Sequence, residues 1–111
     1  MSVKFAAPSY GERCLIRRHR LGLTQSKAAK QFKLPVHVYR QLENNNEVNG
    51  SSLPPVVIGA LQAHERCLLM RRRCGMTQAQ VAKKLGCSRY WLGLQELGKV
   101  PCDDLTWFWE Q

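Results

Sequence analysis

The sequence lacks the features that mark a membrane-bound, exported or metal-binding protein. No segment of its 111 residues is long and apolar enough to cross a bilayer, and residues 1–10 lack the apolar core of a signal peptide. The five cysteines contain no Cys-x-x-Cys pair that could frame a zinc site, and their odd number argues against a disulfide scaffold. We therefore expect a cytoplasmic or nucleoid-associated protein that binds no metal.

Residue patterns that carry catalysis are also missing. His19, His37 and His64 have no acid or nucleophile at a spacing that would pair with them, and no glycine-rich phosphate loop is present. Asp103 and Asp104 are adjacent, but they stand where the start of a helix favours negative charge. We therefore expect a protein that is not an enzyme and that carries no cofactor.

Acidic residues are scarce relative to basic ones. Eight Asp and Glu stand against 17 Lys and Arg, which gives a formal net charge of +9. Such an excess repels itself in a folded chain and is usually matched by a polyanion. Binding to a membrane surface would require an exposed apolar helix face, which these basic segments need for their own cores. The charge therefore predicts a nucleic acid as partner.

What the sequence does contain is an internal repeat. Residues 12–25 return as residues 65–78, and the offset of 53 residues then continues without a gap. A repeat of this length indicates two copies of one structural unit. We expect an N-terminal arm over residues 1–9, a first domain over residues 10–62 and a second domain over residues 63–111.

Each copy is predicted to fold into helices only, because apolar residues recur at helical spacing and no strand-like alternation occurs. Gly22 and Thr24 predict the end of one helix and the cap of the next. Cys14 and Cys67 occupy equivalent positions and are interpreted as small core residues, with a redox switch as the alternative. The predicted helices cover residues 10–20, 25–32, 35–43, 55–73, 78–85 and 89–97, and a short last helix starts at residues 103–104 and contains residues 107–109.

The helix predicted over residues 55–73 would be shared by both copies. Gly59 is the only residue expected to weaken it, at a cost of about 1 kcal/mol relative to alanine. Val57 and Ile58 would close the first core, and Cys67 would belong to the second. A shared helix would support two copies that are each close to the lower size limit of an independent fold.

The order Gly-x-Thr-Gln-x-x-x-Ala, followed by a turn, an apolar position and a glutamate, resembles the helix-turn-helix of the Cro/cI-type (lambda repressor-like) family. The first copy carries this pattern as Gly22, Thr24, Gln25, Ala29, Leu34, Tyr39, Leu42 and Glu43. The second copy carries it as Gly75, Thr77, Gln78, Ala82, Gly86, Cys87, Ser88, Leu92, Glu96 and Gly98. The resemblance covers about residues 10–105. It implies an all-α protein with two tandem helix-turn-helix units, whose third helices enter the major groove of double-stranded DNA.

The resemblance also implies which residues of the first copy contact DNA. Val36, His37 and Gln41 correspond to base-reading positions, where Gln41 can pair with adenine and Val36 can pack on a thymine methyl group. A solvated helix face is the alternative for each exposed polar residue. The implied phosphate contacts are Gln25, Lys27, Arg40 and Asn44.

The second copy keeps the scaffold but departs from this pattern in its third helix. Leu94 falls at the position of Gln41, and Gln95 falls at that of the apolar Leu42. Either this helix is rotated slightly, or the copy has become a weaker reader or a packing partner. The implied DNA-binding residues of the second copy are Gln78, Ser88, Arg89 and Tyr90, with Arg89 suited to guanine.

The predicted function is sequence-specific DNA binding in transcriptional regulation, by a phage or mobile-element repressor that acts as a single-chain pseudo-dimer with two non-identical recognition helices. The alternative is a protein-interaction module, an anti-repressor or antitoxin, whose second copy binds a protein instead of DNA. Trp107, Phe108 and Trp109 offer a candidate interface for a homodimer or a protein partner, or else cover a small core.

Overall fold

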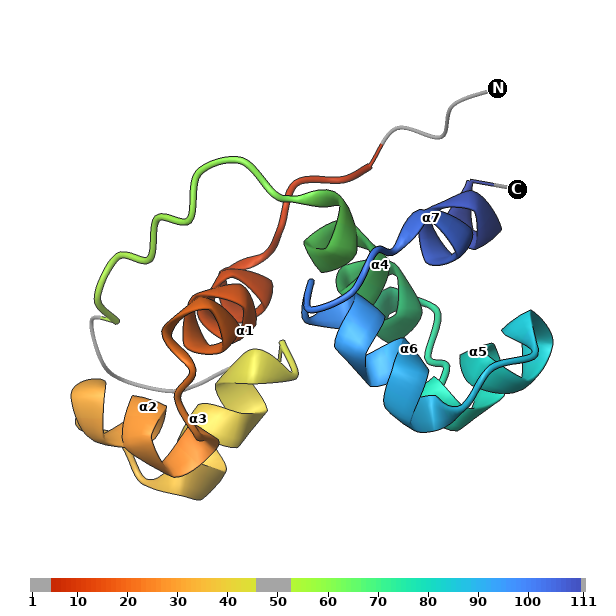
Figure 1. Ribbon diagram of the computed structural model, residues 1–111. Helices are drawn as coiled ribbons and strands as arrows, with labels where there is room; N and C mark the ends of the chain where they lie inside the picture. The colour runs from red at the N-terminus through yellow and green to blue at the C-terminus, as the bar shows by residue number, and fades with distance from the viewer. Residues whose placement is uncertain (1–4, 46–52, 111) are drawn as a thin grey trace. The chain divides into compact units, whose positions relative to one another are not determined.

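The computed structural model describes residues 5–45 and 53–110, and this part of the chain forms seven helices and no strand (Figure 1). The chain divides into two compact units, the first over residues 5–59 and the second over the described residues from Ala60 onward. The helices are α1 (Tyr10–Leu21), α2 (Gln25–Gln31), α3 (Val36–Glu43), α4 (Ala63–Arg73), α5 (Gln78–Leu85), α6 (Arg89–Glu96) and α7 (Asp103–Trp109). The all-α prediction is confirmed for these residues. None of these helices has the length and apolar character needed to span a membrane.

The helix ends of the first unit follow from side chains that the sequence places at them. Ser9 and Glu12 form a capping box at the start of α1, in which the Ser9 backbone N–H donates to Glu12 Oε1 at 2.9 Å. Gly22 ends α1 in the left-handed conformation, with φ at 67°. Thr24 caps α2 by accepting a hydrogen bond from the Lys27 N–H.

The second unit uses the same signals for α5 and α6. Thr77 and Gln80 form a capping box at the start of α5, and Gly86 ends this helix with φ at 72°. The Ser88 hydroxyl caps α6 by accepting a hydrogen bond from the Trp91 N–H at 3.0 Å. These starts and ends agree with the sequence prediction to within one residue.

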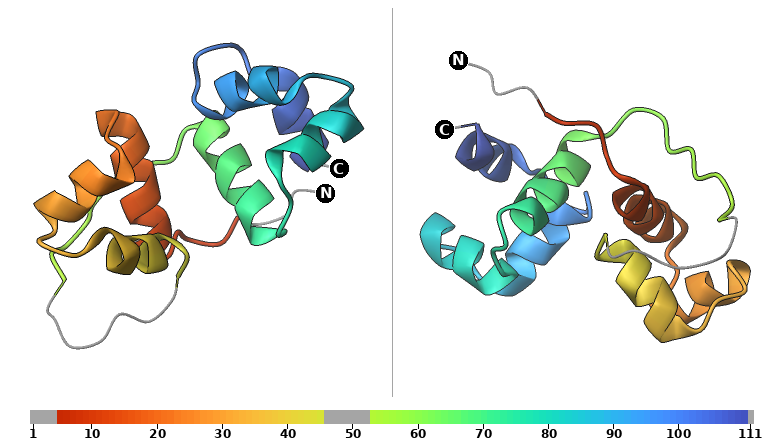
Figure 2. Two further views of the ribbon diagram at one scale, coloured as in Figure 1. Left: turned by 90° about the horizontal axis from the view of Figure 1, so that it is seen from below. Right: turned by 180° about the vertical axis from the view of Figure 1, so that it is seen from behind.

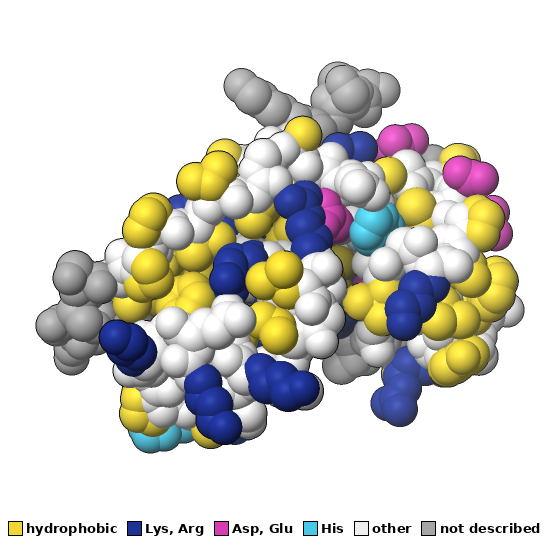
Figure 3. Space-filling model, turned by 60° about the vertical axis from the view of Figure 1, so that its left-hand side comes forward, with side chains coloured by type: hydrophobic (Ala, Val, Ile, Leu, Met, Phe, Trp, Pro, Cys, Tyr) yellow, Lys and Arg dark blue, Asp and Glu magenta, His cyan; other side chains and the backbone are white. Residues whose placement is uncertain are grey.

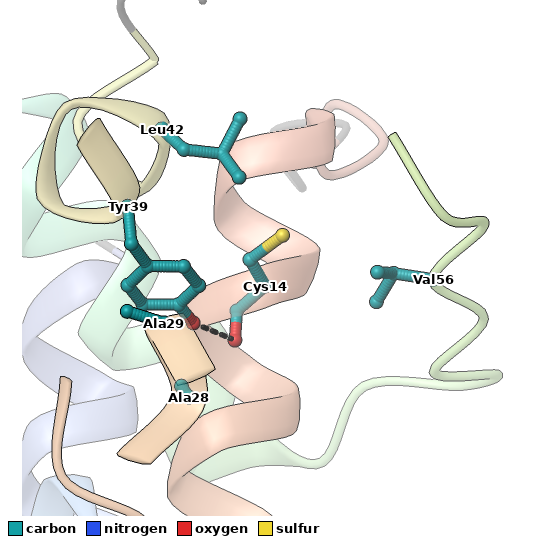
Figure 4. Close-up of a cluster of buried hydrophobic side chains, with 6 residues drawn as sticks. All are labelled: Cys14, Ala28, Ala29, Tyr39, Leu42 and Val56. Atoms are coloured by element: carbon teal, nitrogen blue, oxygen red, sulfur yellow. Dashed lines mark hydrogen bonds between the residues drawn. The ribbon is translucent and has the colours of Figure 1, made fainter. Parts of the chain in front are cut away.

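Each unit has a core built from the inward faces of its helices. In the first unit α1, α2 and α3 enclose the core, and the Tyr39 hydroxyl donates to the Cys14 carbonyl oxygen at 3.5 Å (Figures 2 and 4). The small Ala28 and Ala29 let α2 lie close to its neighbours. The first core contains Cys14, Ala28, Ala29, Tyr39, Leu42 and Val56. The second contains Cys67, Val81, Ala82, Leu92 and Leu105.

Burial decides the protonation state of the two equivalent cysteines. It raises the pKa of both the Cys14 and the Cys67 thiols to about 11. Both thiols therefore stay neutral at physiological pH, which suits their predicted place in the core.

The predicted shared helix is wrong. Residues 53–62 are not helical, and α4 begins only at Ala63, where Gln62 and Glu65 form a capping box. Gly59 adopts a left-handed φ of 65°, which ends any helix that reaches it. The break falls at the point where the shared helix was predicted to join the two copies.

Side chains of α1 explain why this segment is extended. The Arg13 guanidinium donates to the Val56 carbonyl oxygen at 3.0 Å, and Arg20 donates to the carbonyl oxygen of Ile58. An α-helix would bond these carbonyl groups within itself, so the tertiary hydrogen bonds replace helical ones. Val57, predicted to lie in the core, is 89% exposed, and Val56 is buried there instead.

The turn between α2 and α3 contains a strained residue. Lys33 has a φ of 55°, where the second unit has Gly86 at 72°. Side chains with a Cβ adopt this left-handed region at a cost, whereas glycine does not. The first unit therefore carries local strain that the second avoids.

Lys33→Gly should stabilise the first unit and Gly86→Lys should destabilise the second. Each change should amount to about 1 kcal/mol, or a shift of about 4–8 °C in the Tm of a domain of this size. Thermal unfolding followed by circular dichroism measures both. A lower Tm for Lys33→Gly would contradict the interpretation that Lys33 is strained.

Candidate nucleic-acid interface

A buried ion pair joins α1 to the end of α3 in the first unit. Arg18 Nε donates to Glu43 Oε2 at 2.7 Å, and Arg18 Nη2 donates to Glu43 Oε1 at 3.2 Å. Burial acts to raise the pKa of Glu43, but hydrogen bonds from Arg18, Tyr39 and Gln25 outweigh it and hold this pKa below its usual range. Glu43 is therefore an anion inside the unit, and α3 is fixed in position by its partners.

The second unit repeats the contacts between arginine and glutamate atom for atom. Arg71 Nε and Nη2 donate to the two carboxylate oxygens of Glu96 at 2.7 and 3.1 Å. Arg71 Nη1 donates to the Met76 carbonyl oxygen, as Arg18 Nη1 does to that of Leu23. The sequence pattern predicted the two glutamates as part of the motif but neither of the two arginines. The offset of 53 residues, which relates Arg18 to Arg71, was the signal that could have found them.

Gln25 and Gln78 belong to the same networks. Gln25 Nε2 donates to Glu43 Oε1 at 3.1 Å, and Gln78 Nε2 donates to Glu96 Oε1 at the same distance. Gln25 Oε1 also accepts a hydrogen bond from Arg40 Nε at 3.1 Å. Both glutamines, which the resemblance assigns to DNA contact, thus have structural partners within their own units.

The outer face of α3 is polar. His37, Arg40, Gln41 and Asn44 are exposed and recur at the spacing that places residues on one side of a helix. Val36 is only partly exposed, because it packs against the first core. The structure therefore brings four of the predicted DNA contacts together on α3. Lys27, the fifth exposed residue of the prediction in this unit, lies on α2.

The described surface of the first unit is basic because both carboxylates among its described residues are buried. Glu12 and Glu43 are both buried, and they are the only acidic residues among positions 5–45 and 53–59. The basic residues of the same positions are mostly exposed or half-buried. Figure 3 shows Lys and Arg side chains over the part of the molecule where α2 and α3 lie.

The outer face of α6 is different in kind. Leu92, Gln95 and Glu96 are buried, as are their counterparts on α3, so α6 presents the same side to its core and is not rotated. Arg89 is exposed, and Tyr90 is 77% exposed. Ser88, which was also predicted to contact DNA, caps the start of α6 with its hydroxyl group.

The buried Gln95 is poorly accommodated at the position of Leu42. Its Oε1 atom is buried without a hydrogen-bond partner in the described part of the chain, whereas Leu42 packs in an apolar core. An unsatisfied buried acceptor costs about 1–3 kcal/mol. The second unit therefore carries a destabilising substitution that the first does not.

The aromatic tail divides between core and surface. Phe108 and Trp109 are half-buried against the second core, with their ring centroids 4.9 Å apart at an interplanar angle of 78°. Trp107 is 63% exposed. Only one of the three residues of the candidate interface thus presents most of its side chain to the surface.

No group of three or more His, Cys, Asp or Glu side chains within residues 5–45 and 53–110 could hold a metal ion. Comparison of the chain with family models, curated proteins and solved structures gives no match. The function has therefore to be inferred from the geometry and charge of the two units.

Removing either arginine of the ion pairs should destabilise its own unit. The remaining glutamate would be a buried charge without its main partner, which typically costs about 3–5 kcal/mol. Trp91, Trp107 and Trp109 all lie in the second unit, so tryptophan fluorescence reports that unit alone. The free energy of unfolding of Arg71→Ala, measured by urea unfolding with tryptophan fluorescence, should be lower than that of the wild type by this amount.

Arg18→Ala is the matched variant and should show a similar loss by circular dichroism, which detects the helices of both units. A loss below about 1 kcal/mol in either variant, the value typical of a surface pair, would contradict the anchoring role.

Proposed function

We propose that this protein is a sequence-specific double-stranded DNA-binding regulator of transcription, of the helix-turn-helix type, in which α3 of the first unit enters the major groove. The observation that carries the proposal is the polar outer face of α3, made of His37, Arg40, Gln41 and Asn44. An α-helix fits the major groove, and side chains with paired donors and acceptors distinguish base edges there.

The ion pair of the first unit supports this function by holding α3 rigidly. Arg18 ties Glu43 at the end of α3 to α1, and Gln25 ties the same carboxylate to α2. A recognition helix fixed in this way loses little conformational freedom when it binds. The hydrogen bond from Arg40 Nε to Gln25 also holds one side chain of the outer face in place.

Roles on the outer face follow from side-chain chemistry. Gln41 can donate to and accept from the edge of an adenine, and His37 can contact a neighbouring base. Arg40 keeps terminal guanidinium nitrogens for a phosphate while its Nε is held by Gln25. Lys27 and Asn44 add backbone contacts that position the unit on the duplex.

The charge distribution supports DNA as the partner. Both carboxylates in the described part of the first unit are buried, whereas Lys27, Lys30, Lys33 and Arg40 are exposed, so basic side chains predominate on the described surface of this unit. Neutralising phosphates releases counterions from DNA, which strengthens binding at low salt. We thus propose the first unit as the principal DNA-binding unit.

The role of the second unit distinguishes two versions of the function. In the first version Arg89 reads a second half-site, and the chain acts as a single-chain pseudo-dimer repressor. In the second version the second unit binds a protein, as in an anti-repressor or antitoxin. The apolar residues Leu94 and Leu97, which replace Gln41 and Asn44 on the outer face of α6, favour the second version.

Gln41→Ala should weaken binding to a DNA target selected from a random pool. Loss of a bidentate base contact costs about 1–3 kcal/mol, or about 5- to 150-fold in Kd. The preference at one base position should relax at the same time. Lys27→Ala is the matched control, because it should weaken binding to all sequences alike and reduce the salt dependence by about one phosphate contact. Equal effects of both variants on target and scrambled DNA would contradict base reading by α3.

The selected sequences themselves distinguish the two versions. If α6 reads bases, the pool should return a motif in two parts, with centres about 34 Å apart, and Arg89→Ala should erase one part. If the second unit binds a protein, the motif should have one part and Arg89→Ala should leave it unchanged.

A further inference from the structure

The outer face of α6 carries an apolar stripe at the positions that are polar on α3. Tyr90, Leu94 and Leu97 follow one another at helical spacing; Tyr90 and Leu97 are 77% and 44% exposed, and Leu94 between them is half-buried. Their counterparts on α3 are His37, Gln41 and Asn44. An exposed apolar stripe on a helix, with a tyrosine in it, is typical of a surface that binds another protein.

Gly93 lies beside this stripe, and the packing of its own unit does not require a glycine there. A Cβ atom at this position would meet only Gln78 Nε2, at an ordinary contact distance of 3.7 Å. Glycine within a helix destabilises that helix relative to alanine. The missing side chain therefore lowers the stability of α6 without an internal benefit, and it lets a partner approach the backbone of α6 more closely than any other residue would.

The exposed face of α7 complements this stripe. Asp103, Trp107 and Glu110 recur at positions that share one side of the helix, and all three are exposed. An aromatic ring thus lies between two carboxylates. On α6 the exposed Arg89 stands at the start of the stripe, and the exposed Lys99 follows its end. Both stripes are about 10–12 Å long at the rise of an α-helix.

We propose that α6 of one molecule binds α7 of a second copy of this chain. Trp107 packs over Gly93 and Leu97, and the carboxylates of α7 pair with the basic residues at the two ends of the α6 stripe. The two stripes of one molecule do not cover each other, because Tyr90 and Trp107 are both mostly exposed. In a dimer with two-fold symmetry, α6 of each molecule binds α7 of the other, so the dimer contains two equivalent contacts.

This dimer goes beyond the proposed DNA binding and does not depend on it. The test contains no DNA, so a failure here leaves the function proposed for α3 intact. The converse also holds, because a chain that binds no DNA can still form the dimer.

Sedimentation equilibrium of the full chain over a wide range of protein concentration tests the dimer directly. We expect a concentration-dependent rise from the mass of one chain to that of two. Trp107→Ala should raise the dimer dissociation constant at least tenfold, because the exposed tryptophan is the central contact. Val57→Ala, which shortens another exposed apolar residue, in the first unit, is the control and should leave the constant unchanged.

A charge exchange tests the pairing of the two stripes. Arg89→Glu alone, and Asp103→Lys with Glu110→Lys alone, should each prevent the dimer, since both of its contacts then bring like charges together. An equimolar mixture of the two variants should restore it. In the mixed dimer one contact has the natural charges and the other has them reversed. A mixture that stays monomeric would overturn the proposal.

Gly93→Ala separates docking from folding. The variant should raise the Tm of the second unit, as alanine favours the helix, while it weakens the dimer because the added methyl group keeps Trp107 away from the backbone of α6. Wild-type chain that sediments as a monomer at every concentration would overturn the proposal. The same holds if the α6 stripe variants Tyr90→Ala and Leu94→Ala leave the dissociation constant of the dimer unchanged.

Discussion

The buried arginine–glutamate pair is the interaction on which both units depend. In each unit one guanidinium reaches the carboxylate at the end of the third helix and a backbone carbonyl group in the turn after the first. Two charges are taken out of water, which is favourable only when further hydrogen bonds satisfy them, and Gln25 and Gln78 supply these bonds. Because this network holds the inner side of the third helix, the outer side is free to differ between the units.

The two units use their acidic residues in opposite ways. In the described part of the first unit the carboxylates serve internal roles, at a helix cap and in the ion pair, and the surface is left basic. The second unit has the same internal pair of glutamates but adds exposed carboxylates at Asp103, Asp104 and Glu110. The first unit therefore presents a polar, basic face on α3. The second unit presents an apolar stripe on α6 and an acidic face on α7. One scaffold thus presents two surfaces of different chemistry.

Local signals in the sequence predicted what local interactions determine. Thr24, Thr77 and Ser88 bond to backbone groups three residues away, so their effect on helix starts can be read from the sequence alone. The extended segment before α4 could not be predicted in this way, because side chains more than 35 positions earlier determine it. The second role of Gln25 escaped prediction for the same reason, since its partner Glu43 is 18 positions away.

The extended segment that follows residue 52 has a consequence for solubility. Residues 53–58 include Leu53, Val56, Val57 and Ile58, a composition that favours pairing with a strand of another molecule. Pro54 and Pro55 carry no backbone N–H, so this stretch cannot offer a continuous row of donors to an incoming strand. The hydrogen bonds from α1 to the carbonyl groups of Val56 and Ile58 occupy acceptors that such a strand would also need. The bonds from α1 and the two prolines together leave this segment few backbone groups that a strand of another molecule could pair with.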